Sequence, residues 1–332
     1  MNTIGQQRSR KLLLAITYLI LLIIIILAIG IGSVRLSPAE VLQTLTGSGS
    51  EQWNTILWNI RIPRVILALI IGANLAVSGA LLQAVMHNPL ADPGLTGVSS
   101  GAAVTVLFIM LVKPELSSLI PIAAIVGGGI AAAMVYGWAW TKTQGITPIR
   151  IILSGVAVNA VFGGVIGLLS ILYSDKLPAA LSWMNGSLSG KGMDAVLTIL
   201  PYSAAGWIMA LLCIRQANIL RLGEQAAHNL GQNINRVRIT LSFVAVFLAS
   251  VSVSMVGLVG FVGLIVPHMA RMMIGSDYKY SLPFSLALGA VVLIIADTIG
   301  RSMFSPLEIP AGIVMAMVGG PYFLYLMRKG GA

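Results

Sequence analysis

The chain has 332 residues, of which 57% are hydrophobic and only 9% are charged, and its mean hydropathy is +0.94. Soluble globular domains carry about 25% charged residues, so this composition excludes a soluble protein and indicates an integral membrane protein. The net charge of +10 does not indicate a nucleic-acid partner, because no basic patch is interleaved with aromatic residues. A single cysteine, Cys213, excludes an intrachain disulfide.

Apolar runs broken by Pro, Gly or charge predict ten membrane-spanning helices, since about 20 apolar residues cross the roughly 30 Å hydrocarbon core. Residues 1–11 are expected to form a cytoplasmic tail, and the first run after them lacks a convincing cleavage site, so we expect it to be retained. Residues 239–274 would make one helix of about 54 Å, too long for one crossing, and glycines near residue 260 predict a break. The expected helices cover residues 12–32, 63–84, 95–112, 118–139, 149–172, 195–214, 239–257, 259–274, 282–299 and 309–327.

The distribution of Lys and Arg residues predicts which side of the membrane each segment faces. With the N-terminus inside, most of the 20 Lys and Arg residues fall in inner segments, and the positive-inside rule then places both termini and residues 215–238 in the cytoplasm. Arg61, Arg64 and Arg301 lie at helix ends on the outer side. Their charge indicates either snorkelling at the membrane interface or a docking surface for an acidic external partner.

Residues 215–238, RQANILRLGEQAAHNLGQNINRVR, form an unusually polar segment for this chain. Gly223 and Gly231 bracket a predicted helix of about seven residues, each glycine being suited to a cap or tight turn. Such an amphipathic helix could rest on lipid or enter a groove on a partner. In helical projection its apolar residues fall on one side: Leu220, Leu222, Ala226, Ala227 and Leu230.

Two short motifs resemble enzyme signatures without meeting their requirements. GSLSGKG (186–192) has three residues between its first two glycines, where a phosphate-binding loop needs four. GVSSG (97–101) follows a Pro/Gly turn instead of the strand that a nucleophile elbow requires. The three histidines show no metal-ligand spacing. We therefore expect no catalytic residue and no metal or cofactor bound by this chain.

Asp297 lies within an apolar run, and an intramembrane carboxylate is a functional candidate by default. Arg301 follows one helical turn later, so an i,i+4 ion pair is the favoured interpretation. A proton relay in a proton-coupled secondary transporter is the alternative.

Seven stretches together resemble the FecCD-type permease family, the membrane subunits of ATP-driven importers for iron–siderophore complexes, haem and vitamin B12. The "QAVMHNPLADP" and "GLIVPHMAR" blocks, which lie within two of these stretches, are specific to the family. The stretches are RIPRVILALIIGANLAVSGALLQAVMHNPLADPGLTGVSSGAA (61–103), LSGVAVNAV (153–161), WMNGSLSG (183–190), LGEQAAHNLG (222–231), GFVGLIVPHMARMMIGSD (260–277), ADTIGR (296–301) and EIPAGIVMAMVGGPYFLYLM (308–327).

The resemblance implies an all-α polytopic membrane protein with the type II ABC importer permease fold. Residues 1–332 would form one permease domain of ten transmembrane helices, which pairs with a second copy or a paralogue into a twenty-helix bundle. The implied location is the bacterial cytoplasmic membrane. The chain itself would bind no cofactor, since two copies of a cytoplasmic ATPase would use the ATP and Mg.

The resemblance also implies two sites. Residues 215–238 would form a coupling loop that docks into the ATPase, and we expect its contacts to involve Gly223, Glu224, Ala226, Ala227, Leu230 and Gly231. Arg61, Arg64 and Arg301 would face acidic residues of an external substrate-binding protein. An iron–siderophore complex is the expected cargo, with haem or vitamin B12 as alternatives. A proton-coupled secondary transporter and a membrane scaffold that transports nothing are the other classes of function considered.

Overall fold

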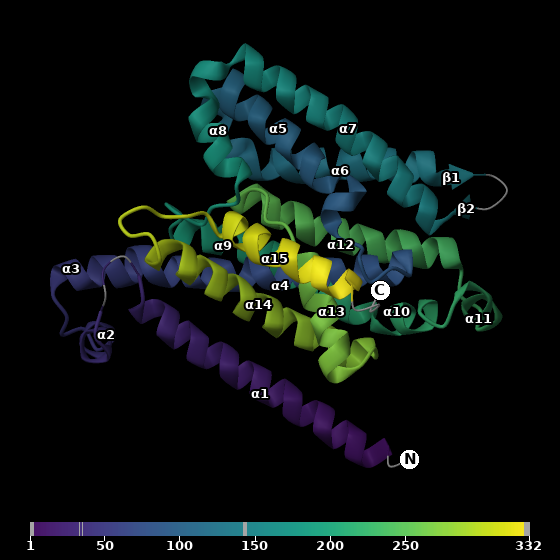
Figure 1. The fold of residues 1–332 in the computed structure, drawn as a ribbon, viewed down its shortest axis with the longest axis horizontal. Helices are drawn as coiled ribbons and strands as arrows, with labels where there is room; N and C mark the ends of the chain where they lie inside the picture. Colours follow the sequence, from purple (N-terminus) through teal and green to yellow (C-terminus); the bar gives the residue numbers. More distant parts are fainter. Residues whose placement is uncertain (1–2, 33, 35, 142–144, 329–332) are drawn as a thin grey trace.

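The computed structural model describes residues 3–32, 34, 36–141 and 145–328, and the chain in these ranges is almost entirely helical. Every predicted span corresponds to a helix (Figure 1). The ten helices are α1 (Thr3–Gly30), α4 (Ile62–Met86), α5 (Val98–Val112), α6 (Ile120–Ala139), α7 (Pro148–Leu172), α9 (Met193–Leu212), α12 (Ile234–Val256), α13 (Val262–Ile274), α14 (Tyr278–Ser302) and α15 (Ala311–Arg328).

Among the described residues, seven of these helices are long and apolar enough to cross a membrane, and α5, α13 and α15 are shorter apolar helices. The chain is therefore an all-α polytopic membrane protein. The predicted break near residue 260 is present, because α12 ends at Val256 and α13 begins at Val262. Helix α1 begins at Thr3, so residues 3–11, expected as a tail, form the first turns of that helix.

Short elements lie at the two ends of the bundle. One end, here called the α11 end, carries α10 (Ile214–Leu220), α11 (Glu224–Asn229) and an antiparallel pair of two-residue strands, β1 (Trp140–Thr141) and β2 (Gly145–Ile146). The other end, the α2 end, carries α2, α3 and α8, on the left in Figure 1. The remaining short elements are α2 (Pro38–Leu45), α3 (Glu51–Asn54), η1 (Thr55–Arg61), η2 (Pro93–Thr96), η3 (Pro114–Leu119), η4 (Ser174–Lys176) and α8 (Leu177–Met184).

The segments predicted to be inner and outer lie at different ends. Residues 215–238 are at the α11 end, where α1 starts and α15 finishes (Figure 1). The last turn of α1, which Arg61 and Arg301 contact, and the last turn of α14, which carries Arg301, are at the α2 end. The alternation of segments that the charge distribution predicted is therefore present.

Helix α4 occupies the centre of the bundle, and nearly all of its side chains are buried. Glycines allow its backbone to touch its neighbours. A Cβ atom added at Gly79 would lie 1.8 Å from the carbonyl oxygen of Gly263 on α13, and one added at Gly72 would lie 2.2 Å from that of Gly289 on α14. Small residues thus permit close helix contact where hydrophobic burial does not drive association.

The glycines of α7 behave differently from those of α4. A Cβ atom added at Gly163, Gly164 or Gly167 would meet nothing within 4 Å in the described part of the chain. These three glycines therefore make no close helix contact within a single chain, in the residues that the structure describes. Helix α7 packs against α5 and α6, and these three helices form a group that meets the rest of the bundle mainly through α12 (Figure 1).

Candidate coupling and docking sites

The segment predicted as a coupling loop contains two short helices, α10 and α11, connected by a tight turn. Gly223 caps the start of α11 with a φ of 98°, and Gly231 follows its end with a φ of 77°. Both values lie in the left-handed half of backbone space, which residues with a Cβ rarely adopt. The predicted bracketing role of these two glycines is confirmed.

The apolar residues of this segment do not share one side. Leu220 and Ala227 are buried against the bundle, whereas Leu222 and Leu230 are 58% and 59% exposed. The prediction of a single apolar side is therefore wrong, because α10 and α11 are separate helices and the turn at Gly223 redirects the chain. Leu220 and Ala227 anchor the segment, and Leu222 and Leu230 project away from the bundle.

Glu224, the first residue of α11, forms an ion pair with Arg238 on α12, with 2.5 Å between Oε1 and Nη2. The other terminal nitrogen of Arg238 donates a hydrogen bond of 2.5 Å to the carbonyl oxygen of Ile146, in strand β2. The Arg238 guanidinium is buried, while the Glu224 carboxylate is half-exposed. A single buried cation therefore connects α11, α12 and the connection between α6 and α7.

Three further hydrogen bonds fasten α10 to the membrane helices. The Nε2 atom of His87, at the end of α4, lies 2.8 Å from the carbonyl oxygen of Leu220. Asn218 donates to the Asp277 carboxylate at 2.8 Å and accepts from the backbone N–H of Tyr278, the first residue of α14. Displacement of the loop would therefore pull on α4, α12 and α14 together.

A cluster of charged side chains lies at the α2 end, where α4, α14 and the segment before α15 meet. Arg64 is its centre. The Nε atom of Arg64 is 3.0 Å from each carboxylate oxygen of Asp297, and its Nη1 atom is 2.7 Å from Glu308. Glu308 also accepts a hydrogen bond of 3.0 Å from Ser189, in the segment between α8 and α9.

The other two arginines hold the end of α1. Arg61 donates to the carbonyl oxygens of Ile29 and Gly30 at 2.8 and 2.9 Å, and also to that of Val34. Arg301 donates to the carbonyl oxygen of Ala28. The last carbonyl groups of a helix lack partners within the helix and favour cations nearby, so these contacts satisfy the end of α1.

The three arginines thus lie at one end, as predicted, but each is only 4% exposed. Snorkelling does not describe them, since their guanidinium groups bond within the protein. The predicted pair of Asp297 and Arg301 is confirmed at 3.6 Å, although the closer contacts of Asp297 are with Arg64, 2.9 Å away.

Sequence reasoning missed Glu308 and Arg238. Glu308 gave a signal, because it is the one acidic residue between α14 and α15, whereas nothing local singled out Arg238. In the part of the chain that the structure describes, no set of three or more His, Cys, Asp or Glu side chains gathers as metal ligands do.

Burial raises the pKa of Glu308, but the hydrogen bond and charge of Arg64, with a further hydrogen bond from Ser189, lower it more. The net pKa of Glu308 therefore lies below its ordinary value of 4.5, and the carboxylate is charged at neutral pH. Arg64 is accordingly held between two carboxylates, one buried and one partly exposed.

Comparison with known proteins identifies the relatives of this architecture. The FecCD transport family profile matches residues 20–329. The chain is 38% identical over 328 residues to the Fe(3+)-citrate import system permease protein YfmE of Bacillus subtilis, covering 98% of both chains. It is 36% identical over 290 residues to the hemin transport system permease protein HmuU of Yersinia pestis, covering 86% of each.

A solved structure supports the same assignment. An inward-facing conformation of a metal-chelate type ABC transporter superposes with a TM-score of 0.85 at 28% identity, covering 97% of this chain and 100% of that one. The relatives of this chain are permease subunits, so the chain is a transport subunit and not itself an enzyme. This assignment excludes the alternative function of a proton-coupled secondary transporter. The chain belongs to the FecCD transport family and is the permease subunit of an ATP-binding-cassette importer.

Proposed function

We propose that this permease imports an iron–siderophore complex, powered by a separate ATPase and supplied by an external binding protein. The observation that carries the ATPase part is the geometry of α11. Leu222 and Leu230 project from a segment that is itself fastened to three membrane helices. Two exposed leucines flanking a short helix suit a helix-in-groove contact, and the fastenings would transmit the movement of the partner to the bundle.

The proposed coupling residues have different roles. Leu222 and Leu230 supply the contact, while Glu224, through its ion pair with Arg238, and the buried Ala227 position α11. Ala226 is half-buried. Gly223 and Gly231 set the entry and exit of the chain through their positive φ angles.

Docking of the binding protein is proposed at the α2 end. Arg61, Arg64 and Arg301 remain our candidates, but their guanidinium groups already have partners within the chain. Glu308 is the most accessible member of the cluster, with 36% of its side chain exposed. We propose that an acidic residue of the binding protein reaches Arg64 by displacing Glu308.

The cargo assignment rests on relatives. Permeases named for Fe(3+)-citrate and iron(3+)-hydroxamate are among the most similar proteins, at 38% and 35% identity. Others are named for hemin and cobalamin, so haem and vitamin B12 are the alternative cargoes. We propose a location in the bacterial cytoplasmic membrane with both termini inside. The partners would be a second permease subunit, two ATPase copies using ATP and Mg, and one binding protein.

The coupling proposal is tested by replacing Leu222 and Leu230 with serine in the full transporter reconstituted in vesicles. Both side chains are exposed, so the double variant should fold with a stability change within about 0.5 kcal/mol. It should lose association with the ATPase and ATP-driven uptake of cargo. The control is Leu42→Ser, an equally exposed leucine at the α2 end. Unchanged uptake in the double variant would refute the coupling assignment.

Cargo is tested separately, by measuring uptake of ferric citrate, a ferric hydroxamate, haem and cobalamin with the cognate binding protein present. We expect a ferric siderophore to be taken up preferentially. Preferential uptake of haem or cobalamin would overturn the cargo proposal while leaving the ATPase coupling intact.

A further inference from the structure

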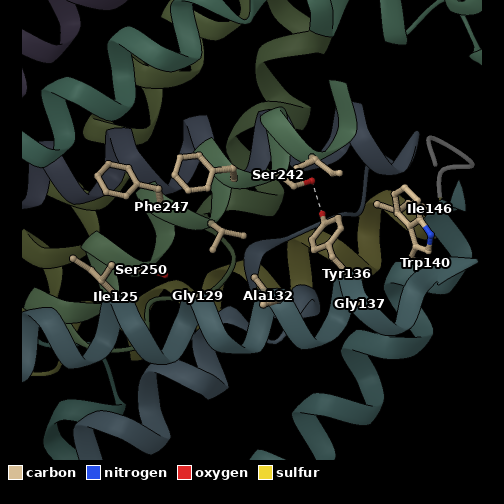
Figure 2. Close-up of a pocket in the computed structure, with 14 residues that line it drawn as sticks. Ile125, Gly129, Ala132, Tyr136, Gly137, Trp140, Ile146, Ser242, Phe247 and Ser250 are labelled. Atoms are coloured by element: carbon tan, nitrogen blue, oxygen red, sulfur yellow. Dashed lines mark hydrogen bonds between the residues drawn. The ribbon is translucent and has the colours of Figure 1, made fainter. Parts of the chain in front are cut away.

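A groove of about 580 Å³ runs between α6 and α12 (Figure 2) and meets the anchor of the coupling segment at Ile146. Its lower wall is formed by α6 from Ile125 to Gly137, followed by Trp140 in β1, and its upper wall by α12 from Ile239 to Ser250 (Figure 2). Glycines keep it open, since a Cβ atom added at Gly129 would meet nothing within 4 Å. A volume between about 300 and 1,000 Å³ is typical of small-molecule sites.

The groove has the length of one membrane leaflet. The α12 residues that line it span about 16 Å at about 1.5 Å per residue, or about half of the roughly 30 Å hydrocarbon core. It starts at the α11 end, where Trp140 and Ile146 lie, and closes before the far ends of both helices. A ligand with the length of one leaflet therefore fits along it.

A single hydrocarbon chain suits an apolar groove of this length. A helix of a second permease subunit is the competing occupant, and the cross-linking outcome described below distinguishes the two.

The lining is almost wholly apolar. Phe243 and Phe247 stack with ring centroids 6.4 Å apart and form an aromatic wall. The hydroxyl groups of Tyr136 and Ser242 bond to each other across the groove, and Ser250 lies near Ile125 (Figure 2). With two of its three hydroxyl groups paired with each other, the groove favours a hydrocarbon ligand over a polar one.

The mouth of the groove lies among exposed apolar side chains, which a bilayer would cover with hydrocarbon. Phe243 and Ile239 are exposed on α12, Trp138 is exposed on α6, and Trp140 is exposed in β1. Tryptophan is enriched at membrane interfaces, which places the α11 end of the groove near lipid headgroups. Arg236 is exposed one helical turn before Ile239, on the same side of α12. A negatively charged headgroup at this end would meet a cation.

We propose that this groove binds one acyl chain of an anionic phospholipid from the leaflet at the α11 end, with its headgroup beside Arg236. The bound chain fills the gap between the α5–α7 group and α12. The proposal concerns the membrane-embedded surface and does not depend on the cargo, the ATPase or the binding protein.

Photolabelling tests the acyl-chain site. The full chain is reconstituted in phosphatidylethanolamine vesicles containing phosphatidylglycerol with a diazirine in its acyl chain, irradiated, and mapped by peptide mass spectrometry. Label should concentrate on Ala133, Phe243 and Phe247 relative to Leu19 and Leu22 of α1, which are exposed apolar residues outside the groove. Equal labelling of the two sets would show bulk lipid contact only and overturn the site.

Variants that place a larger side chain in the groove provide a second test of the acyl-chain site. Gly129→Leu should abolish the excess labelling, and Ala133→Leu at the exposed mouth gives an independent variant if the first fails to fold. The control is Gly164→Leu on α7, whose added Cβ also meets nothing within 4 Å, and it should label as the unchanged chain does. Excess labelling that survives both filling variants, or cross-links from the groove to a second permease copy, would overturn the proposal.

The headgroup assignment has its own test. Arg236→Gln should reduce labelling by phosphatidylglycerol about fivefold, which corresponds to roughly 1 kcal/mol for one basic residue near an anionic surface. Labelling by an equivalent phosphatidylcholine probe should not change. Equal labelling by the two lipids in the unchanged chain would refute the preference for an anionic headgroup.

Discussion

At the scale of single residues, Glu224 and Arg238 are unequal partners, since the cation is buried and the carboxylate is half-exposed. Removing Glu224 leaves a buried guanidinium with one carbonyl partner, a loss that costs about 1–3 kcal/mol. We therefore expect Glu224→Ala to lower the free energy of unfolding by that amount, measured by thermal or denaturant unfolding in detergent.

The double variant Glu224→Ala/Arg238→Met is the matched comparison. Replacing both partners of a buried polar contact with apolar groups can be nearly neutral, so the double variant should recover part of the lost stability. A double variant whose loss equals the sum of the two single losses would show that the pair is not coupled.

Glu308 should give the cluster at the α2 end a dependence on pH. Its pKa is lowered by Arg64 in the folded chain, and a group with a lowered folded pKa stabilises above its unfolded pKa and loses that contribution as the pH falls through the folded value. At neutral pH, Glu308→Gln should be less stable than the unchanged chain by up to about 1 kcal/mol, because the side chain is partly exposed.

The difference between the two unfolding midpoints should shrink as the pH falls below the ordinary glutamate value of 4.5. Glu115→Gln serves as the control, because its side chain is exposed and lies outside the cluster. A difference that stays constant across this range would contradict the role of the Glu308 charge.

At the scale of elements, glycine contacts fix how closely α4 approaches α13. A Cβ atom at position 79 would lie 1.8 Å from the Gly263 carbonyl oxygen, so the two helices must separate. Overpacking of this kind costs about 1–3 kcal/mol and occasionally more. We expect Gly79→Ala to reduce the yield and melting temperature of the detergent-purified chain.

The control is Gly164→Ala on α7, where an added Cβ meets nothing and alanine is the better helix former. This variant should be neutral or slightly stabilising. Equal melting temperatures for Gly79→Ala and Gly164→Ala would show that the α4–α13 contact does not limit stability.

The sequence predicts the long helices well, because apolar runs of about 20 residues have a single physical meaning in a membrane protein. The break between α12 and α13 followed from the length of the apolar run together with the glycines near residue 260. Short elements such as α2, α3 and α8 were not predicted, since they are too short and too polar to give that signal. Helix α1 starts earlier than predicted because its first turns are polar yet helical.

The sequence could not predict which side chains contact each other when they lie far apart along the chain. The pair Asp297 and Arg301 is local and was predicted, whereas Arg64 and Asp297 are 233 positions apart. Charge at helix ends indicated that three arginines lie together at the α2 end, but not that they face inward. Likewise, the turn at Gly223 was predicted, but the separation of Leu230 from Ala227 depends on how α11 packs.

At the scale of the whole molecule, orientation is the property on which the proposed partners depend. Gln225 is exposed on α11, and Ser48 is exposed between α2 and α3. Cysteine placed at Ser48 should react with a membrane-impermeant maleimide in intact spheroplasts, and cysteine at Gln225 should react only after permeabilisation. The native Cys213 is buried and provides the background. The reverse pattern would place the proposed ATPase contact on the wrong side of the membrane.

The position of Arg238 has a consequence for the resting state of the transporter. Its guanidinium joins α11 to Ile146, just before α7. A conformation that parts α7 from α11 must break one of these bonds, at about 1–3 kcal/mol, which lowers its population about 5- to 150-fold. The isolated permease is thus biased toward one arrangement of its two helix groups, and a motor protein that seats α11 elsewhere has to supply at least that difference.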